Sequence, residues 1–159
     1  MRIVATRRRR PEDAPDLPAA ASSLRYIESS ALVAALLEQD AEAQAEVREI
    51  GRRISSSLTL AETARALLRA RVTRRISVDE ERSALRALRR FERHSVIIDV
   101  TEAVLTRAGR QFPIEPIRTL DAIHLATIES LGEAPQLVTV VTRDARVARN
   151  AKAFGYAVV

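Results

Sequence analysis

Four acidic residues in this 159-residue sequence lie beside apolar segments, where a carboxylate needs a chemical or structural reason. Glu28 ends a short apolar stretch and precedes an apolar helix, where burying an unpaired charge is costly. Glu62 interrupts the apolar segment 58–68. Asp121 and Asp144 fall in the first turns of predicted helices, where the helix dipole by itself favours a carboxylate by about 0.3–1 kcal/mol.

These four carboxylates would repel one another if the fold brought them together, unless a cation held them. The sequence contains no cysteine, which excludes disulfides, cysteine–zinc sites and thiol nucleophiles, and only two histidines, His94 and His124. A histidine-rich metal site is excluded as well. Oxygen ligands favour a hard ion, Mg²⁺ or Mn²⁺, which can activate water and stabilise a phosphodiester under attack.

The composition narrows the classes of function further. The four glycines are scattered, so neither common phosphate-binding glycine loop can be written. The net charge of +5 fits a polyanionic partner, although a GC-rich coding sequence that favours arginine over lysine explains it as well. No apolar run approaches the ~20 residues that span a bilayer, and the N-terminus lacks the apolar core of a signal peptide. We therefore expect a cytoplasmic protein.

Short β-compatible segments alternate with helical ones after a different N-terminal part. Residues 1–23 hold three prolines and the run Arg7–Arg10, which predicts a tail without a specific role; an RNA-attracting arm and a start codon placed too far upstream are the alternatives. Residues 24–159 are predicted as one domain. The predicted strands are 24–28, 53–57, 95–100, 136–142 and 156–159. The predicted helices are 30–39, 40–50, 58–72, 78–93, 101–109, 119–132 and 143–154.

This alternation predicts a parallel sheet with helices on both faces, whose ligand site lies at the carboxyl ends of the strands. Polar residues are expected to cap the helices, including Ser29 or Ser30 for the first helix and Thr142 for the last. Glu28, Glu62 and Asp144 fall at or just after strand ends. Asp121 lies before the strand 136–142 and needs the tertiary fold to join them.

Four blocks of the sequence resemble the PIN domain and, within it, the VapC-type toxin ribonucleases of bacterial toxin–antitoxin pairs. The resemblance covers about Leu24 to Val159, and RTLDAIHLAT is its most specific block. In chain order the blocks are YIESSALVAALL (Tyr26–Leu37), SSLTLAETARAL (Ser56–Leu67), RTLDAIHLAT (Arg118–Thr127) and VTVVTRDARVARNAKAFGYAVV (Val138–Val159). The resemblance implies a three-layer α/β/α sandwich with a central, mainly parallel sheet.

The resemblance also implies an activity: Mg²⁺- or Mn²⁺-dependent endoribonuclease cleavage, with transfer RNA or ribosomal RNA among the family's substrates. A small VapB-type antitoxin and a homodimer are the implied partners. By position, the family's metal-binding and catalytic acids correspond to Glu28, Glu62, Asp121 and Asp144. Ser30 matches the hydroxyl residue after the first acid, and Thr142 the one before the last.

Two features depart from the family pattern. Most members have aspartate where this chain has Glu28, whose extra methylene moves the carboxylate outward by on the order of 1.5 Å. The N-terminus is also extended.

Three further residues near the predicted cleft have two interpretations each. His124 orients a carboxylate or approaches substrate, or else is a packed, hydrogen-bonded partner. Arg118 and Arg143 bind phosphate or are simply solvated. His94 has no chemical role.

Three functions remain as hypotheses. The first is a metal-dependent endoribonuclease toxin. The second is a catalytically weakened PIN-like module that binds RNA or protein, with Glu28 marking an impaired site. The third, a phosphoacceptor receiver domain, needs a lysine after a late strand, and the only lysine here is Lys152, inside the last predicted helix.

Overall fold

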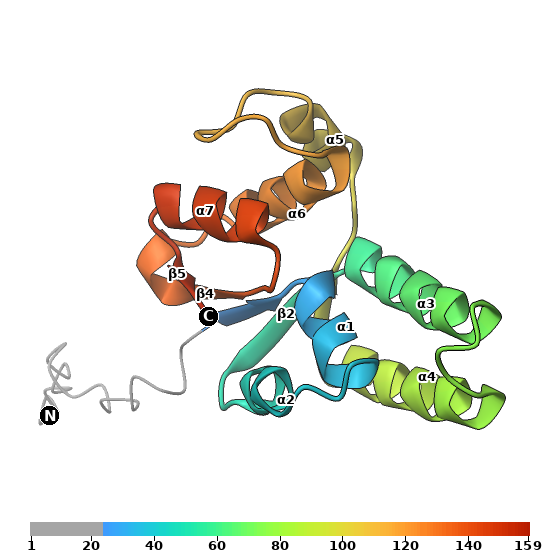
Figure 1. Cartoon of the computed structure of the whole chain (residues 1–159). Helices are drawn as coiled ribbons and strands as arrows, with labels where there is room; N and C mark the ends of the chain where they lie inside the picture. The colour runs from blue at the N-terminus through green and yellow to red at the C-terminus, as the bar shows by residue number, and fades with distance from the viewer. Residues whose placement is uncertain (1–23) are drawn as a thin grey trace, which may run out of the picture.

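A central sheet of five parallel strands organises the part of the chain that the computed structural model describes, residues 24–159 (Figure 1). The predicted tail, residues 1–23, lies outside the described residues. The strand order is β3-β2-β1-β4-β5, and every neighbouring pair is parallel. The strands are β1 (Leu24–Ile27), β2 (Arg52–Ser56), β3 (Val96–Ile98), β4 (Val138–Val141) and β5 (Ala157–Val158).

Helices cover both faces of this sheet, which confirms the predicted three-layer α/β/α architecture (Figure 1). On one face lie the helices that connect β1 to β2 and β2 to β3: α1 (Ser29–Leu36), α2 (Ala41–Arg48), α3 (Ser57–Val72) and α4 (Val78–Arg93). On the other lie α5 (Glu102–Ala108), α6 (Thr119–Ser130) and α7 (Ala145–Ala153). None of these helices is long and apolar enough to cross a membrane.

The side chains of β1 contribute to two separate hydrophobic cores, because successive side chains of a strand point to opposite faces of the sheet. Tyr26 packs among residues of β4, α6 and α7, whereas Ile27 packs among residues of α1, α2 and α4. Both side chains are fully buried. The apolar runs of β1 and β4 therefore have the composition of strands covered on both sides.

The chain changes direction across the sheet between β1 and β4, and this is where a binding crevice opens in such folds. Connections leaving β1 run toward β3 on one face, and those that enter β4 return on the other. Ile27 pairs with Val141 at the carboxyl ends of these two strands, and the backbone N–H of Glu28 donates to the Val141 carbonyl at 3.0 Å. Glu28 and Thr142 therefore emerge side by side.

Two predicted helix caps are wrong, and both lie at the carboxyl ends of β1 and β4. Neither Ser29 nor Ser30 caps α1: Glu28 is the N-cap, and its carboxylate accepts from the Ser30 backbone N–H. Thr142 does not cap α7 either, because Asp144 takes that position and accepts from the backbone N–H groups at the helix start. A carboxylate accepts these bonds as well as a hydroxyl does, which leaves the hydroxyls free for other contacts.

Some element ends also differ from the prediction. Strand β3 is shorter than the predicted 95–100, because it is an edge strand that pairs only with β2 over Val96–Ile98. Helix α1 ends at Leu36, and the positive φ of 55° at Gln39 turns the chain before α2. The predicted boundaries of the remaining helices hold to within a few residues.

Candidate active site

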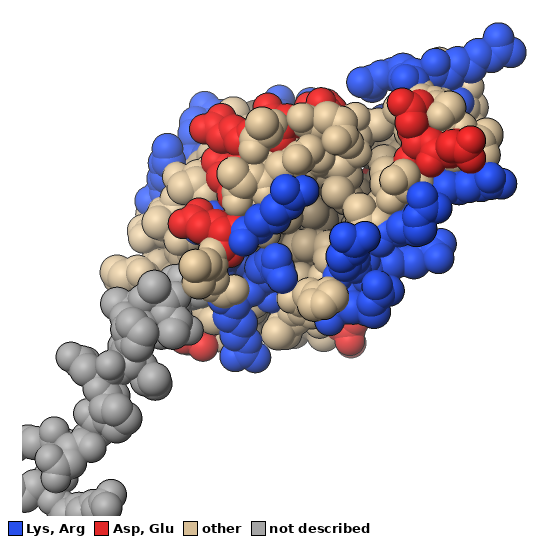
Figure 2. All heavy atoms as spheres, turned by 90° about the horizontal axis from the view of Figure 1, so that it is seen from below, with Lys and Arg blue, Asp and Glu red and all other residues tan. Residues whose placement is uncertain are grey.

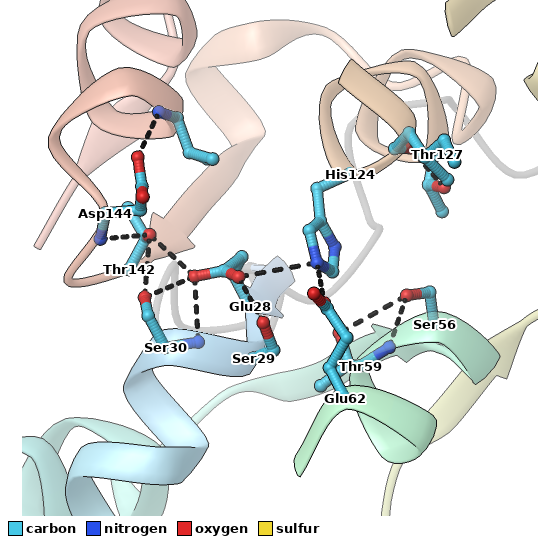
Figure 3. A network of polar contacts seen from close by, with 12 residues as sticks. Glu28, Ser29, Ser30, Ser56, Thr59, Glu62, His124, Thr127, Thr142 and Asp144 are labelled. Carbon is cyan, nitrogen blue, oxygen red and sulfur yellow. Dashed lines mark hydrogen bonds and ion pairs between the residues drawn. The ribbon is translucent and has the colours of Figure 1, made fainter. Parts of the chain in front are cut away.

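Glu28 is buried at the end of β1, with 3% of its surface exposed, and hydroxyl groups surround its carboxylate (Figure 3). Ser29 donates to Oε1 at 2.5 Å. Oε2 accepts from the Ser30 backbone N–H at 3.0 Å, from the Ser30 hydroxyl and from Thr142 Oγ1 at 2.8 Å. Hydrogen bonds to the ionised form are what allow a buried carboxylate to stay charged. This arrangement answers why a charge is tolerated at the end of an apolar strand.

His124 joins this carboxylate to a second one. The ring is 1% exposed and lies on α6, with its Nε2 2.7 Å from Glu62 Oε2 and 3.4 Å from Glu28 Oε1 (Figure 3). Its other nitrogen, Nδ1, lies 3.1 Å from the Tyr26 hydroxyl. The geometry fits a buried, hydrogen-bonded His124 and equally a His124 that orients a carboxylate, since its partners include both of the unusual glutamates.

Glu62 reaches the site from the first turns of α3, which Ser56 caps. Burial raises the pKa of the Glu62 carboxyl, but its interaction with His124, first of all the hydrogen bond, and a hydrogen bond from Ser29 outweigh burial and bring the pKa below its ordinary value. The carboxylate form is therefore the one that this site favours. The apolar segment 58–68 is interrupted because this position faces the crevice and not the core.

Asp121 and Asp144 form a second acidic pair beside the first. Burial, and next the negative charge of Asp144, raise the pKa of Asp121, while Arg118 and Arg146 partly oppose the rise. Oδ2 of Asp121 is buried and has no hydrogen-bond partner among the described residues. The Asp144 backbone N–H donates to Thr142 Oγ1, the same hydroxyl that donates to Glu28.

These residues fit a hard divalent cation. One ligand atom each from Glu28, Glu62 and His124 lies within 4.8 Å of the others, and the buried Oδ2 of Asp121 has no hydrogen-bond partner within residues 24–159. Carboxylate oxygens are the donors that Mg²⁺ and Mn²⁺ sites prefer. The close group of atoms contains two of the four predicted acids, Glu28 and Glu62, and Asp121 and Asp144 lie outside it.

The predicted basic residues have separate positions. Arg143 follows Thr142, and its backbone N–H donates to Ser30 Oγ, but its guanidinium reaches away to Glu46 on α2 at 2.7 Å. Arg118 is the N-cap residue of α6, and its charge acts on Asp121. His94, as expected, lies outside the site, at the end of α4.

Sequence reasoning missed Tyr26 and Ser29 as members of this site. The sequence pattern predicts Ser29 only as a helix cap and Tyr26 only as part of an apolar strand. One signal was available: in a strand, residues two apart share a face, and Tyr26 precedes Glu28 by two. Nothing in the sequence indicated that the tyrosine would meet a histidine 98 residues away.

Comparison with known proteins decides the family. The model of the PIN domain matches residues 25–153. "Ribonuclease VapC46" of Mycobacterium tuberculosis is 40% identical over 136 residues, which cover 84% of this chain and 95% of the relative. The chain belongs to the PIN domain family, among the VapC ribonucleases.

Solved structures share the fold of this PIN domain. A crystal structure of M. tuberculosis VapC20, described as a sarcin–ricin loop cleaving toxin, has a TM-score of 0.58 and 17% identity, and covers 79% of this chain and 93% of its own. VapBC2 from Rickettsia felis, bound to a DNA fragment from its promoter, has a TM-score of 0.58 and 14% identity, and covers 86% of this chain and 97% of its own. At these identities the likeness concerns architecture.

The raised pKa of Asp121 predicts how the PIN domain's stability depends on pH. A carboxyl with a raised folded-state pKa costs stability as pH rises through and above the ordinary aspartate value, and costs nothing in more acidic solution. Asp121→Asn should therefore make the metal-free protein at pH 7 at least as stable as wild type, with the two converging below pH about 4. Urea unfolding at several pH values measures this.

Asp79→Asn is the matched control, because Asp79 also lies in the first turn of a helix but is exposed. This control should not change the pH dependence. Mg²⁺ should raise the melting temperature of wild type and of Asp79→Asn, but not of Asp121→Asn, by linkage to binding. A metal-free Asp121→Asn protein that melts well below metal-free wild type would contradict the repulsion between Asp121 and Asp144.

The hydroxyl contacts of Glu28 predict that its length suits this site. Glu28→Asp withdraws the carboxylate by about 1.5 Å from hydroxyls that now reach it, Ser30 and Thr142 among them. We expect Mn²⁺ affinity, measured by calorimetry, to fall about tenfold or more. Thr142→Val, which removes one of these hydroxyls, should lower the affinity in the same direction. A gain in affinity and RNA cleavage on Glu28→Asp would instead identify the natural site as impaired.

Proposed function

We propose that this protein is the toxin of a VapBC-type toxin–antitoxin pair, an endoribonuclease that depends on Mg²⁺ or Mn²⁺. The observation that supports this most directly is the closeness of buried Glu28 and partly exposed Glu62 at the β1–β4 crevice, together with a buried Asp121 oxygen that has no hydrogen-bond partner within residues 24–159. Membership of the VapC ribonucleases supports the reaction class. The proposed substrate is RNA in the cytoplasm; transfer RNA and ribosomal RNA stay predictions, as does the homodimer.

In the proposed reaction, Glu28 and Glu62 hold the cation, with Asp121 and Asp144 as further acidic ligands. When bound, the ion supplies a Lewis acid for the phosphodiester and lowers the pKa of a water molecule. The hydroxyls of Ser29, Ser30 and Thr142 hold the Glu28 carboxylate in place before any ligand arrives. A preorganised acidic site avoids rearrangement during the reaction.

The test is single-turnover cleavage of an RNA substrate by purified protein, with and without EDTA. We expect cleavage by wild type with Mg²⁺ or Mn²⁺, and loss of cleavage on adding EDTA. Asp121→Asn should reduce cleavage toward the EDTA level, whereas the exposed control Asp79→Asn should cleave like wild type. Equal cleavage in all samples would remove the proposal and indicate a contaminating nuclease.

A groove between α2 and α4 supports the antitoxin as partner. Its hollow of about 310 Å³ has an apolar floor that includes Leu36 and Phe91, and Arg48, Arg53 and Arg90 line it. Figure 2 shows Lys and Arg side chains on both sides of a hollow on this face. The three arginines make no ion pair within residues 24–159. An apolar floor between cationic walls suits an acidic amphipathic segment, and we propose that the antitoxin supplies it.

Reversing charge in this groove tests the partner. Arg48→Glu combined with Arg90→Glu should weaken binding of the co-expressed antitoxin by about tenfold or more, since like charges across an interface cost several kcal/mol. RNA cleavage by the free protein should equal that of a control variant with the same change of net charge. Arg65→Glu together with Arg69→Glu, exposed on α3, is the matched control. Full binding by the groove variant would place the antitoxin elsewhere.

A further inference from the structure

We propose that Tyr26 and His124 form a positioning pair, in which the tyrosine fixes the ring so that its Nε2–H always faces Glu62 and Glu28. His124 then acts on the cation through the glutamates and is not itself a ligand. This inference rests on the proposed metal-dependent function and deepens it. It concerns two residues that are not among the four predicted acids.

The surroundings of Nε2 determine which nitrogen carries the proton. Both atoms facing it, Glu62 Oε2 at 2.7 Å and Glu28 Oε1 at 3.4 Å, belong to carboxylates, which only accept hydrogen bonds when ionised. Nε2 must therefore be the donor. A nitrogen that carries a proton has no lone pair for a metal, so this ring orientation opposes direct coordination.

Tyr26 secures the opposite side of the ring. Its hydroxyl lies 3.1 Å from Nδ1, and in the neutral ring Nδ1 is the acceptor once Nε2 holds the proton. The Tyr26 side chain is fully buried, and a phenol hydroxyl is able to donate to this nitrogen.

The outcome is a directional chain from Tyr26 on β1 through His124 on α6 to the glutamates. Figure 3 shows the part of this chain that joins His124 to Glu28 and Glu62. Tyr26, His124 and Glu28 are almost completely buried, whereas the Glu62 side chain is 25% exposed and opens toward the crevice. Metal-site residues that lie behind the ligands commonly control affinity by orienting those ligands. Tyr26 and His124 occupy that position here.

The first experiment observes the ring nitrogens directly. Protein labelled with ¹⁵N-histidine contains only His94 and His124, so His94→Gln assigns the spectrum. We expect the His124 Nε2 to carry a proton and Nδ1 to be an unprotonated acceptor, both without and with saturating Mg²⁺. Loss of the Nε2 proton on Mg²⁺ binding would make His124 a ligand and overturn the proposal. A proton found on Nδ1 of the neutral ring would overturn it too.

The second experiment measures Mn²⁺ affinity by calorimetry in matched variants. Tyr26→Phe removes only the hydroxyl, and we expect a loss of about two- to tenfold, the range for one hydrogen bond. Tyr156→Phe is the control, since Tyr156 is also largely buried but packs against Phe154, and it should bind like wild type. His124→Asn should lose about 10- to 100-fold, whereas His124→Gln, which keeps an N–H near the Nε2 position, should recover most of it.

The outcomes separate this inference from the proposed function. If wild type binds neither Mn²⁺ nor Mg²⁺, the metal-dependent function fails. If wild type binds Mn²⁺ and Tyr26→Phe matches Tyr156→Phe, the positioning pair fails and the function stands. Equal losses in His124→Gln and His124→Asn would also count against a donor at Nε2. Should the His124 variants not fold, Tyr26→Phe and the nitrogen spectrum still decide.

Discussion

Glu28 places a carboxylate inside the molecule at the end of β1, and the residues around it are arranged to compensate that charge. Transfer of an isolated carboxylate from water to a protein interior is strongly unfavourable. Here three hydroxyl groups, a backbone N–H and the edge of an imidazole surround it. A second glutamate and an aspartate lie close by. The hydrogen bonds to Glu28 offset part of the repulsion among these acidic groups.

The parallel topology makes this convergence possible. Ser29 and Ser30 lie at the start of α1, directly after β1, and Thr142 lies directly after β4. Because β1 and β4 are parallel neighbours, these hydroxyls lie at the same edge of the sheet. Ser30 and Thr142 lie 112 residues apart in sequence, yet their hydroxyl oxygens are 3.2 Å apart. A substitution of either residue would therefore remove a contact of the other.

Charge is divided in this protein between an acidic crevice and an arginine-rich exterior. The whole sequence carries a net charge of +5, while the four carboxylates at the crevice are buried or partly buried. Surface arginines attract a polyanion at long range, whereas the carboxylates of the crevice repel one. Helix α2 touches both regions, since Glu46 holds Arg143 beside the site and Arg48 lines the groove.

The pattern of apolar segments in the sequence was sufficient to predict the strands, the helices and the layered parallel sheet. Burial on two faces demands continuous apolar strands, and helix faces demand a period of 3.6 residues. Glu28 and Glu62 could also be singled out from the sequence, because each places a charge within or at the end of an apolar run. Errors were confined to strand and helix ends, where a carboxylate at Glu28 or Asp144 replaced the expected hydroxyl cap.

Only the tertiary structure decided which side chains meet. Tyr26, a core residue by its pattern, contacts His124, and His124 contacts two glutamates from different elements. Hydrogen bonds between residues this far apart depend on the rotation of each helix against the sheet, which packing of both cores sets and no local pattern encodes. The sequence thus determined that acids would gather at one edge, and the packing determined what holds them there.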